Sequence, residues 1–181
     1  MIANMMPRLA FMTLGVLHEP VGTPKVQGFV DRIAGVYGAA DSSSGFLGRS
    51  ERDVENWSHS WGQIVRPNCI PEARSDDRLA MTLSLWESLE SVAAFAYSGA
   101  HGEALSKRKE WFESGDFPTY VAWWVLDDHQ INWADAASRL DHLHEFGSSP
   151  SAFTFAKPFG PDGNPYTLDR HTIKAKSMTN A

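Results

Sequence analysis

The 181-residue sequence predicts an α+β protein built on a ferredoxin-like antiparallel sheet with helices on one face. Short apolar segments alternate with longer segments in which apolar residues recur at helical spacing, and together they give the order βαββαβ. A long irregular segment interrupts this pattern between the second and third strands. The chain length fits one domain with one sizeable core, which we expect to span residues 8–157.

The first half of the chain is expected to supply two strands and one helix. Residues 8–17 are apolar and bounded by prolines, as short buried strands are. Thr23 suits the N-cap, and Pro24 the first position, of a helix that continues to residue 41 with one apolar face. Residues 46–51 have the composition of a second, short strand.

The second half is expected to supply the remaining strands and helices. Leucine and methionine alternate with smaller residues along the third strand, and Ser88 suits the N-cap of the helix after it. In chain order the expected elements are a strand at 78–88, helices at 89–99 and 98–112, a strand at 119–127, a helix at 132–147 and a short strand at 151–156. Residues 158–181 contain Pro, Gly and a polar end, and we expect an extended or mobile tail.

The second face of such a sheet predicts a homodimer. Helices on one face leave the other face bare, and large apolar side chains there need a cover, which a second copy of the chain would provide. Trp123 and Trp124 are adjacent on a strand, so their side chains point to opposite faces. We expect one of them to pack under the helices and the other to enter the dimer interface.

Composition excludes several classes of protein. The net charge is −6 without a basic stripe, so nucleic acid is not an expected partner. The single cysteine, Cys69, excludes an intrachain disulfide and a cysteine-based zinc site. No segment reaches the ~20 apolar residues that a membrane-spanning helix needs, and no secretory leader is recognisable. Motifs of nucleotide-binding proteins and of serine or zinc hydrolases are missing. A soluble, cytoplasmic protein is expected.

One stretch of the chain carries the clearest candidate for catalysis. His101, Leu105, Arg108 and Phe112 step by four, three and four residues, so a single helix would place them on one stripe. In the functional interpretation, His101 is a general acid or base and Arg108 polarises a carbonyl or binds an oxyanion. In the structural interpretation, Arg108 pairs with a carboxylate such as Glu87, and His101 bonds a backbone carbonyl.

The irregular segment 52–77 supplies a second candidate. Trp57, His59 and Trp61 alternate in the sequence WSHSW, and in an extended chain all three face the same way. Two aromatic plates around an imidazole suggest a lid over an apolar ligand, with His59 near the reacting group. The alternative is a loop that simply packs on the domain through its tryptophans.

The other histidines give no recognisable metal site. His142 and His144 are two residues apart on an expected helix, so their side chains diverge and do not chelate one ion. Asp127, Asp128 and His129 follow one another at a strand end, where three consecutive side chains seldom converge. A solvated turn is favoured, with His129 as a secondary pocket residue, and we expect no metal.

Several motifs occur together in one order. They are Trp86–Glu87–Ser88, Phe95–Tyr97–His101, Arg108–Trp111–Phe112, Trp123–Trp124 and Ala152–Phe155. On these motifs the chain resembles the DUF3291 family over roughly residues 8–157. That family is placed in the dimeric α+β barrel superfamily, which implies a small-molecule cavity between helices and sheet. The resemblance implies no single reaction, because one fold hosts many functions.

We therefore expect a cofactor-independent enzyme that acts on a hydrophobic small molecule, such as a polyketide- or terpenoid-like intermediate. It would catalyse a cyclisation, cycloaddition, isomerisation or dehydration in an aromatic-lined cavity. The expected substrate-binding residues are Trp57, Trp61, Trp86, Tyr97, Trp111, Phe112, Trp124 and His129. The alternatives are a ligand- or haem-binding module without turnover, with His101 or His18 on the haem iron, and a cofactor-free monooxygenase.

Overall fold

The computed structural model describes residues 6–53, 55–56, 58–126 and 129–180. It confirms an α+β protein with an antiparallel sheet of four strands in the order β2-β5-β1-β6. The strands of this sheet are β1 (Arg8–Val16), β2 (Phe46–Arg49), β5 (Leu79–Trp86) and β6 (Tyr120–Val125). With helices α1 (Gln27–Asp41) and α2 (Leu89–Tyr97), they follow the predicted order βαββαβ.

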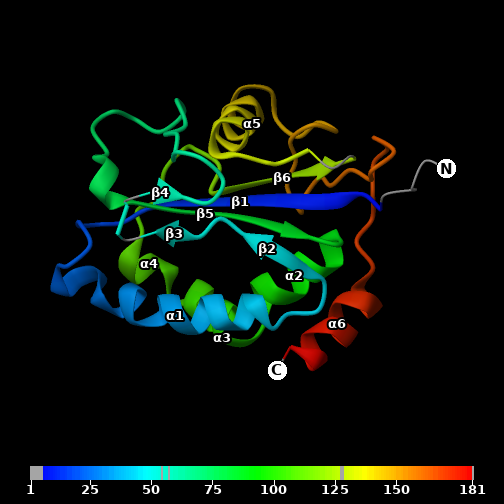
Figure 1. The fold of residues 1–181 in the computed structure, drawn as a ribbon, viewed down its shortest axis with the longest axis horizontal. Helices are drawn as coiled ribbons and strands as arrows, with labels where there is room; N and C mark the ends of the chain where they lie inside the picture. The colour runs from blue at the N-terminus through cyan, green and yellow to red at the C-terminus, as the bar shows by residue number, and fades with distance from the viewer. Residues whose placement is uncertain (1–5, 54, 57, 127–128, 181) are drawn as a thin grey trace.

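Helices cover both faces of this sheet (Figure 1). Helices α1, α2, α3 (Gly99–Ser106) and α4 (Arg108–Trp111) lie on one side of it, which we call the helix side. Helix α5 (Trp133–Phe146) lies on the other side. The predicted cap at Ser88 is present, because its Oγ accepts a hydrogen bond from the Ser91 amide. The predicted cap at Thr23 is not, because Thr23 precedes a short 3-10 helix (Pro24–Val26) and its hydroxyl donates to the Pro20 carbonyl. Helix α5 is capped by Asn132, whose Oδ1 accepts a hydrogen bond from the Asp135 amide.

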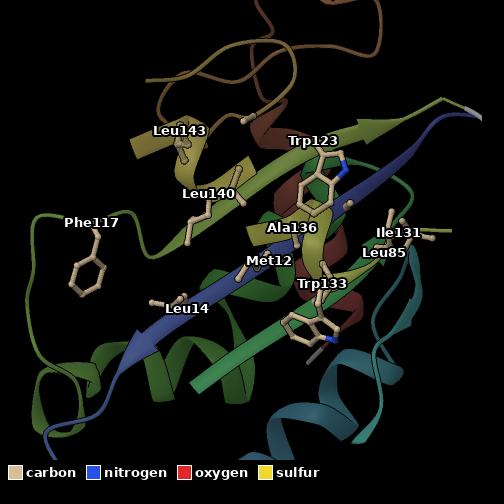
Figure 2. Packing of buried hydrophobic residues seen from close by; sticks show 14 of the residues in the cluster. Met12, Leu14, Leu85, Phe117, Trp123, Ile131, Trp133, Ala136, Leu140 and Leu143 are labelled. Carbon is tan, nitrogen blue, oxygen red and sulfur yellow. The ribbon is translucent and has the colours of Figure 1, made fainter. Parts of the chain in front are cut away.

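Helix α5 corrects the prediction that helices occupy one face only. Its side chains Ala136, Leu140 and Leu143 join one buried cluster with Met12 of β1 and Trp123 of β6 (Figure 2). Trp123 is therefore buried under a helix of its own chain and does not need a second copy to cover it. The argument that led to a homodimer loses its premise, because the second face of the sheet is already packed.

The irregular segment forms a small hairpin and a loop beside α5. Strands β3 (Arg52–Asp53) and β4 (Ser58–His59) pair with each other and not with the main sheet. Further along, buried Ile70 and half-buried Trp61 pack against the same cluster as α5. Three hydrogen bonds tie the loop to the helix, from the Asn68 amide, the Asn68 side chain and the Cys69 amide to the Asp141 carboxylate.

The segment 98–112 is not one helix. Helix α3 ends at Ser106, Lys107 takes a turn conformation, and α4 contains only four residues. Helix α3 begins directly after α2, at Gly99, whose φ of +54° is one that glycine adopts readily. The predicted stripe of four residues is therefore interrupted between Leu105 and Arg108.

The end of the chain is folded, which corrects the expected extended or mobile tail at residues 158–181. Residues 170–179 form helix α6 (Arg170–Thr179), which packs against α2 (Figure 1). Buried Glu90 of α2 accepts hydrogen bonds from the Tyr166 hydroxyl (2.8 Å) and the Asp169 amide (3.1 Å). The expected strand at 151–156 is reduced to isolated bridges: Phe153 pairs with Ala122 of β6, Ala152 with Ser149, and Thr154 with Lys157.

Candidate functional site

His101 lies in α3 on the helix side of the sheet, half-buried. Its Nδ1 atom is 2.8 Å from the carbonyl oxygen of Ala96, and its ring centroid is 4.7 Å from that of Phe95. A carbonyl oxygen only accepts hydrogen bonds, so Nδ1 carries the proton and Nε2 carries the lone pair of the neutral ring. No described residue forms a hydrogen bond with Nε2. The backbone carbonyl bond foreseen in the structural interpretation is thus present, and it leaves Nε2 free for a substrate.

Burial sets the charge of this imidazole. Desolvation lowers the pKa of His101 below its usual value, and the hydrogen bond to the Ala96 carbonyl opposes that effect more weakly. A pKa below 6.5 keeps the ring neutral at pH 7. His101 is therefore a base with a fixed tautomer.

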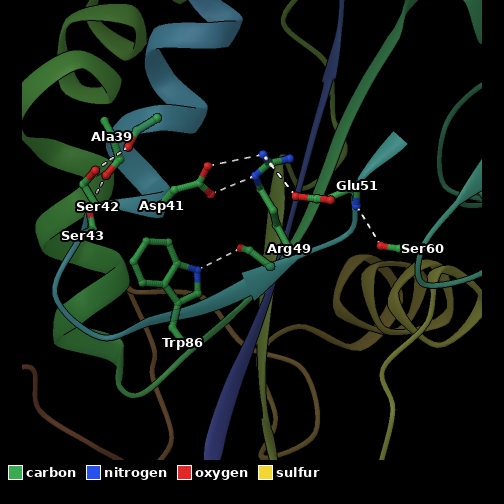
Figure 3. A network of polar contacts seen from close by, with 10 residues as sticks. Ala39, Asp41, Ser42, Ser43, Arg49, Glu51, Ser60 and Trp86 are labelled. Atoms are coloured by element: carbon green, nitrogen blue, oxygen red, sulfur yellow. Dashed lines mark hydrogen bonds and ion pairs between the residues drawn. The ribbon is translucent and has the colours of Figure 1, made fainter. Parts of the chain in front are cut away.

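Aromatic rings connect His101 to the sheet. From Phe95 the contacts continue to Trp86 of β5, with ring centroids 5.2 Å apart, and from Trp86 to Phe46 of β2, 5.0 Å apart. The indole N–H of Trp86 donates to the Ser84 hydroxyl at 2.9 Å (Figure 3). Trp86 is buried and fixed by this bond, so it acts as a rigid wall behind Phe95.

A second group of rings lies on the same side of the sheet, at β1 and β6. Phe155 packs with Phe11, Tyr120 and Tyr97 at centroid distances of 5.6, 5.3 and 5.9 Å. The Tyr120 hydroxyl accepts a hydrogen bond from the Phe155 amide, and burial raises the pKa of Tyr120. Tyr97 is 61% exposed, so this ring group reaches the surface of the molecule.

The layer between α1 and the sheet is incompletely packed. On the opposite face of the sheet, Met12 and Leu14 are buried at 0% and 3% exposure. On the helix side, however, the inward residues of the strands and of α1 are half-buried. They are Thr13, Gly15, Ala80, Thr82, Phe29, Val30, Ile33, Val36 and Tyr37. Solvent therefore reaches apolar and hydroxyl groups here that a filled core would enclose.

Arg108 does not share this environment. Its side chain is exposed, and its guanidinium donates to the Leu105 carbonyl at 3.0 Å. Both predicted placements of Arg108 are wrong, because the turn at Lys107 rotates it out of the stripe and Glu87 is not its partner in the described structure. His101 and Arg108 do not form a catalytic pair.

His59 lies on the opposite side of the sheet from His101. Its ring packs edge-on against Trp133 of α5, with centroids 5.6 Å apart. The Nδ1 atom of His59 is buried and has no hydrogen-bond partner among the described residues. Desolvation, followed by nearby Arg52, lowers the pKa of His59. Trp61 belongs to the same α5-side cluster, so neither His59 nor Trp61 closes over His101. Trp57 lies outside the described residues.

The remaining predicted substrate-binding residues divide between core and surface. Trp111 is buried under the start of α1, where the Arg32 guanidinium lies 5.2 Å from its ring centroid. Phe112 is half-buried and contacts Phe29 at a centroid distance of 5.0 Å, which places it at one end of the helix-side layer. Trp124 also faces the helix side, as predicted for one of the two tryptophans, but its N–H is held by the Phe159 carbonyl at 2.7 Å. His129 is exposed.

Metal and cavity geometry do not add to this site. Among the residues that the structure describes, no group of three or more His, Cys, Asp or Glu side chains is placed to hold a metal ion. An open groove of about 390 Å³ lies between α5 and the loop at 65–68, and a smaller one lies along residues 66–76. Among the described residues, no predicted site residue lines either groove. The Asp141 carboxylate in the larger groove already accepts three loop hydrogen bonds.

Sequence reasoning missed two hydroxyl residues that face the helix side. Thr13 of β1 and Thr82 of β5 are paired across the sheet, and their hydroxyl oxygens are 2.7 Å apart. The only trace of this pair in the sequence is one threonine inside each of two strands predicted to be apolar. The sequence pattern does not give the strand register, and only that register brings the two hydroxyls together.

The family model for a domain of unknown function, DUF3291, matches residues 8–169. The chain belongs to the DUF3291 family. No curated protein matches this DUF3291 chain. Within the described residues, no helix is long and apolar enough to cross a bilayer.

Solved structures resemble the DUF3291 chain only distantly. A conserved protein from Methanosarcina mazei Go1 is 11% identical, with a TM-score of 0.42, over 68% of this chain and 95% of that one. The NE2512 protein of unknown function from Nitrosomonas europaea is 10% identical, with a TM-score of 0.44, over 68% and 94%. PA3566 from Pseudomonas aeruginosa is 7% identical, with a TM-score of 0.42, over 70% and 98%.

Proposed function

We propose that this DUF3291 protein is an enzyme that needs no cofactor and moves a proton on a hydrophobic small molecule. The reaction is an isomerisation, a dehydration or a cyclisation. The observation that carries the proposal is the state of His101. Its tautomer is fixed by the Ala96 carbonyl at 2.8 Å, and its Nε2 lone pair is unpartnered beside an incompletely packed aromatic layer.

The chemistry follows from a neutral imidazole at pH 7. Nε2 of His101 takes a proton from a carbon next to a carbonyl group, and the electron pair of the broken C–H bond moves to the carbonyl oxygen as an enolate. The imidazolium then returns the proton to a different carbon, which completes an isomerisation. In a dehydration it instead protonates a β-hydroxyl group, which leaves as water.

The surroundings of His101 favour an apolar substrate. Phe95, Trp86 and the inward side of α1 offer aromatic and aliphatic surface, and burying apolar area is the main source of affinity for such a ligand. Apolar surroundings also keep the pKa of His101 low, so the same feature binds the substrate and keeps the base unprotonated. The substrate class that fits these surroundings is a polyketide- or terpenoid-like intermediate.

Hydrogen–deuterium exchange tests the proposal without knowledge of the natural substrate. A panel of neutral cyclic ketones, including 1-tetralone, is incubated with the protein in D₂O, and deuterium uptake next to the carbonyl is followed by ¹H NMR. The variant His101→Gln keeps an N–H donor for the Ala96 carbonyl but has no basic nitrogen. We expect it to lose exchange activity by about 100-fold or more, the usual contribution of a general base.

The control is His144→Ala, which removes an exposed imidazole from α5 on the opposite side of the sheet. It should exchange at the wild-type rate, and near-ultraviolet circular dichroism should be unchanged for both variants. Wild-type exchange by His101→Gln would contradict the proposal. Saturable ketone binding with exchange no faster than in buffer would instead favour the ligand-binding module, and a Soret band on haem titration that depends on His101 would favour the haem-binding form of it.

A further inference from the structure

Two threonine hydroxyls form an isolated polar point on the helix side of the sheet. Thr13 lies between Met12 and Leu14, which both face the α5 side, so the Thr13 side chain faces the helices. Its partner Thr82 has the same orientation on β5. The two hydroxyl oxygens are 2.7 Å apart and both residues are half-buried. Solvent, or a ligand that displaces it, therefore reaches this pair.

Rings and aliphatic side chains surround the pair. Tyr120 of β6 is opposite Thr13 on its other flank, and Phe11 lies two residues away on the same face. The Gly15 position is occupied from above by Phe112, whose ring would meet any side chain added there at 2.6 Å. The pair thus sits in the floor of the layer between the sheet and the helices, on the same side of the sheet as His101.

Charged groups near this layer are already engaged. The Arg49 guanidinium lies 4.3 Å from the Tyr37 ring centroid and donates to Asp41 at 3.2 Å (Figure 3). The Arg32 guanidinium donates to the Gly28 carbonyl at 2.7 Å and pairs with Glu103. These cations are held at the rim of α1 by partners of their own chain. An anionic ligand would meet no unpaired cation among them, so its desolvation would be uncompensated.

We propose that the Thr13–Thr82 pair binds the oxygen of a neutral ring compound, a ketone or an alcohol, in the layer between α1 and the sheet. The inference rests on the proposed function, since it places the substrate of His101. One of the two hydroxyl protons is used within the pair, which leaves one O–H to donate to a carbonyl and several lone pairs to accept from an alcohol. A hydrocarbon of the same shape leaves that donor unsatisfied.

Binding of three matched probes tests this assignment. The probes are 1-tetralone, tetralin, which has the same rings without the oxygen, and 1-naphthoate, which carries a charge. Each is titrated into the full-length protein by ligand-observed NMR. We expect 1-tetralone to bind about threefold to tenfold more tightly than tetralin, the ratio that one net hydrogen bond gives, and 1-naphthoate to bind more weakly than 1-tetralone.

The double variant Thr13→Val, Thr82→Val removes both hydroxyls and keeps the branched shape that suits a strand. We expect its affinities for 1-tetralone and tetralin to become equal within about twofold, while tetralin binding stays at the wild-type level. Thr119→Val, at an exposed position outside the strands, is the control and should keep the preference for the ketone.

The outcomes separate this inference from the proposed function. Four results would overturn the role of the pair. In the wild type they are equal affinity for 1-tetralone and tetralin, no saturable binding of 1-tetralone, and tighter binding of 1-naphthoate than of 1-tetralone. The fourth is a preference for the ketone that survives in the double variant. A preference that depends on the two threonines, combined with wild-type exchange by His101→Gln, would retain the binding site and refute the catalytic base.

Discussion

Leu140→Ala tests the packing of α5 on the second face of the sheet, the largest departure from the fold that the sequence predicts. Leu140 is 0% exposed and lies in the cluster that Met12 and Trp123 form with α5 (Figure 2). Removing a fully buried leucine side chain costs about 2–5 kcal/mol, from lost transfer free energy and from the cavity left behind. A domain of ordinary stability would lose about a third of its unfolding free energy.

Urea unfolding followed by tryptophan fluorescence measures this loss, with an unchanged m-value as the check that the variant still unfolds in the same two-state manner. His144→Ala, on the exposed side of the same helix, is the control and should change the unfolding free energy by less than about 0.5 kcal/mol. The loss in Leu140→Ala should be independent of protein concentration, because every contact lies within one chain. A loss below about 0.5 kcal/mol, or one that shrinks as protein concentration rises, would refute the reasoning.

Two further predictions concern protonation and the folded tail. Burial lowers the pKa of His101 and of His59 in the folded chain. Near pH 6 the unfolded chain therefore binds more protons than the folded chain. The unfolding free energy that these residues contribute above the ordinary histidine pKa of 6.5 is lost as the pH falls through their lower folded values. His101→Gln should reduce the slope of unfolding free energy against pH between 7 and 5, and an unchanged slope would contradict the assignment. Tyr166→Phe removes the donor to buried Glu90, so it should destabilise the chain by about 1–2 kcal/mol in the same urea assay, whereas no change would mean that the tail is not held there.

Local sequence patterns were sufficient for the elements of the fold. Alternation in the strand that ends at Trp86 and the side-chain cap at Ser88 place elements that the structure confirms. These signals involve residues one to four positions apart, so they survive without knowledge of the tertiary structure.

Contacts between distant segments were beyond those patterns. The helical stripe predicted for His101 and Arg108 is interrupted by the turn at Lys107, which the helical spacing of its apolar residues does not predict. His59 and His101 were grouped by chemistry alone, yet the hairpin that carries His59 leaves the main sheet and packs on the side of α5. An apolar stripe predicts that a helix face is buried, without naming the surface that buries it.

The sequence by itself determined the α+β class and the order of the main strands and helices, because both depend on short-range periodicity. Only the tertiary structure decided that α5 covers the second face, that the end of the chain folds back on α2 through Glu90, and that Thr13 meets Thr82. Strand register and the choice of sheet face are set by the summed packing of residues far apart in the chain, and no local pattern contains that sum.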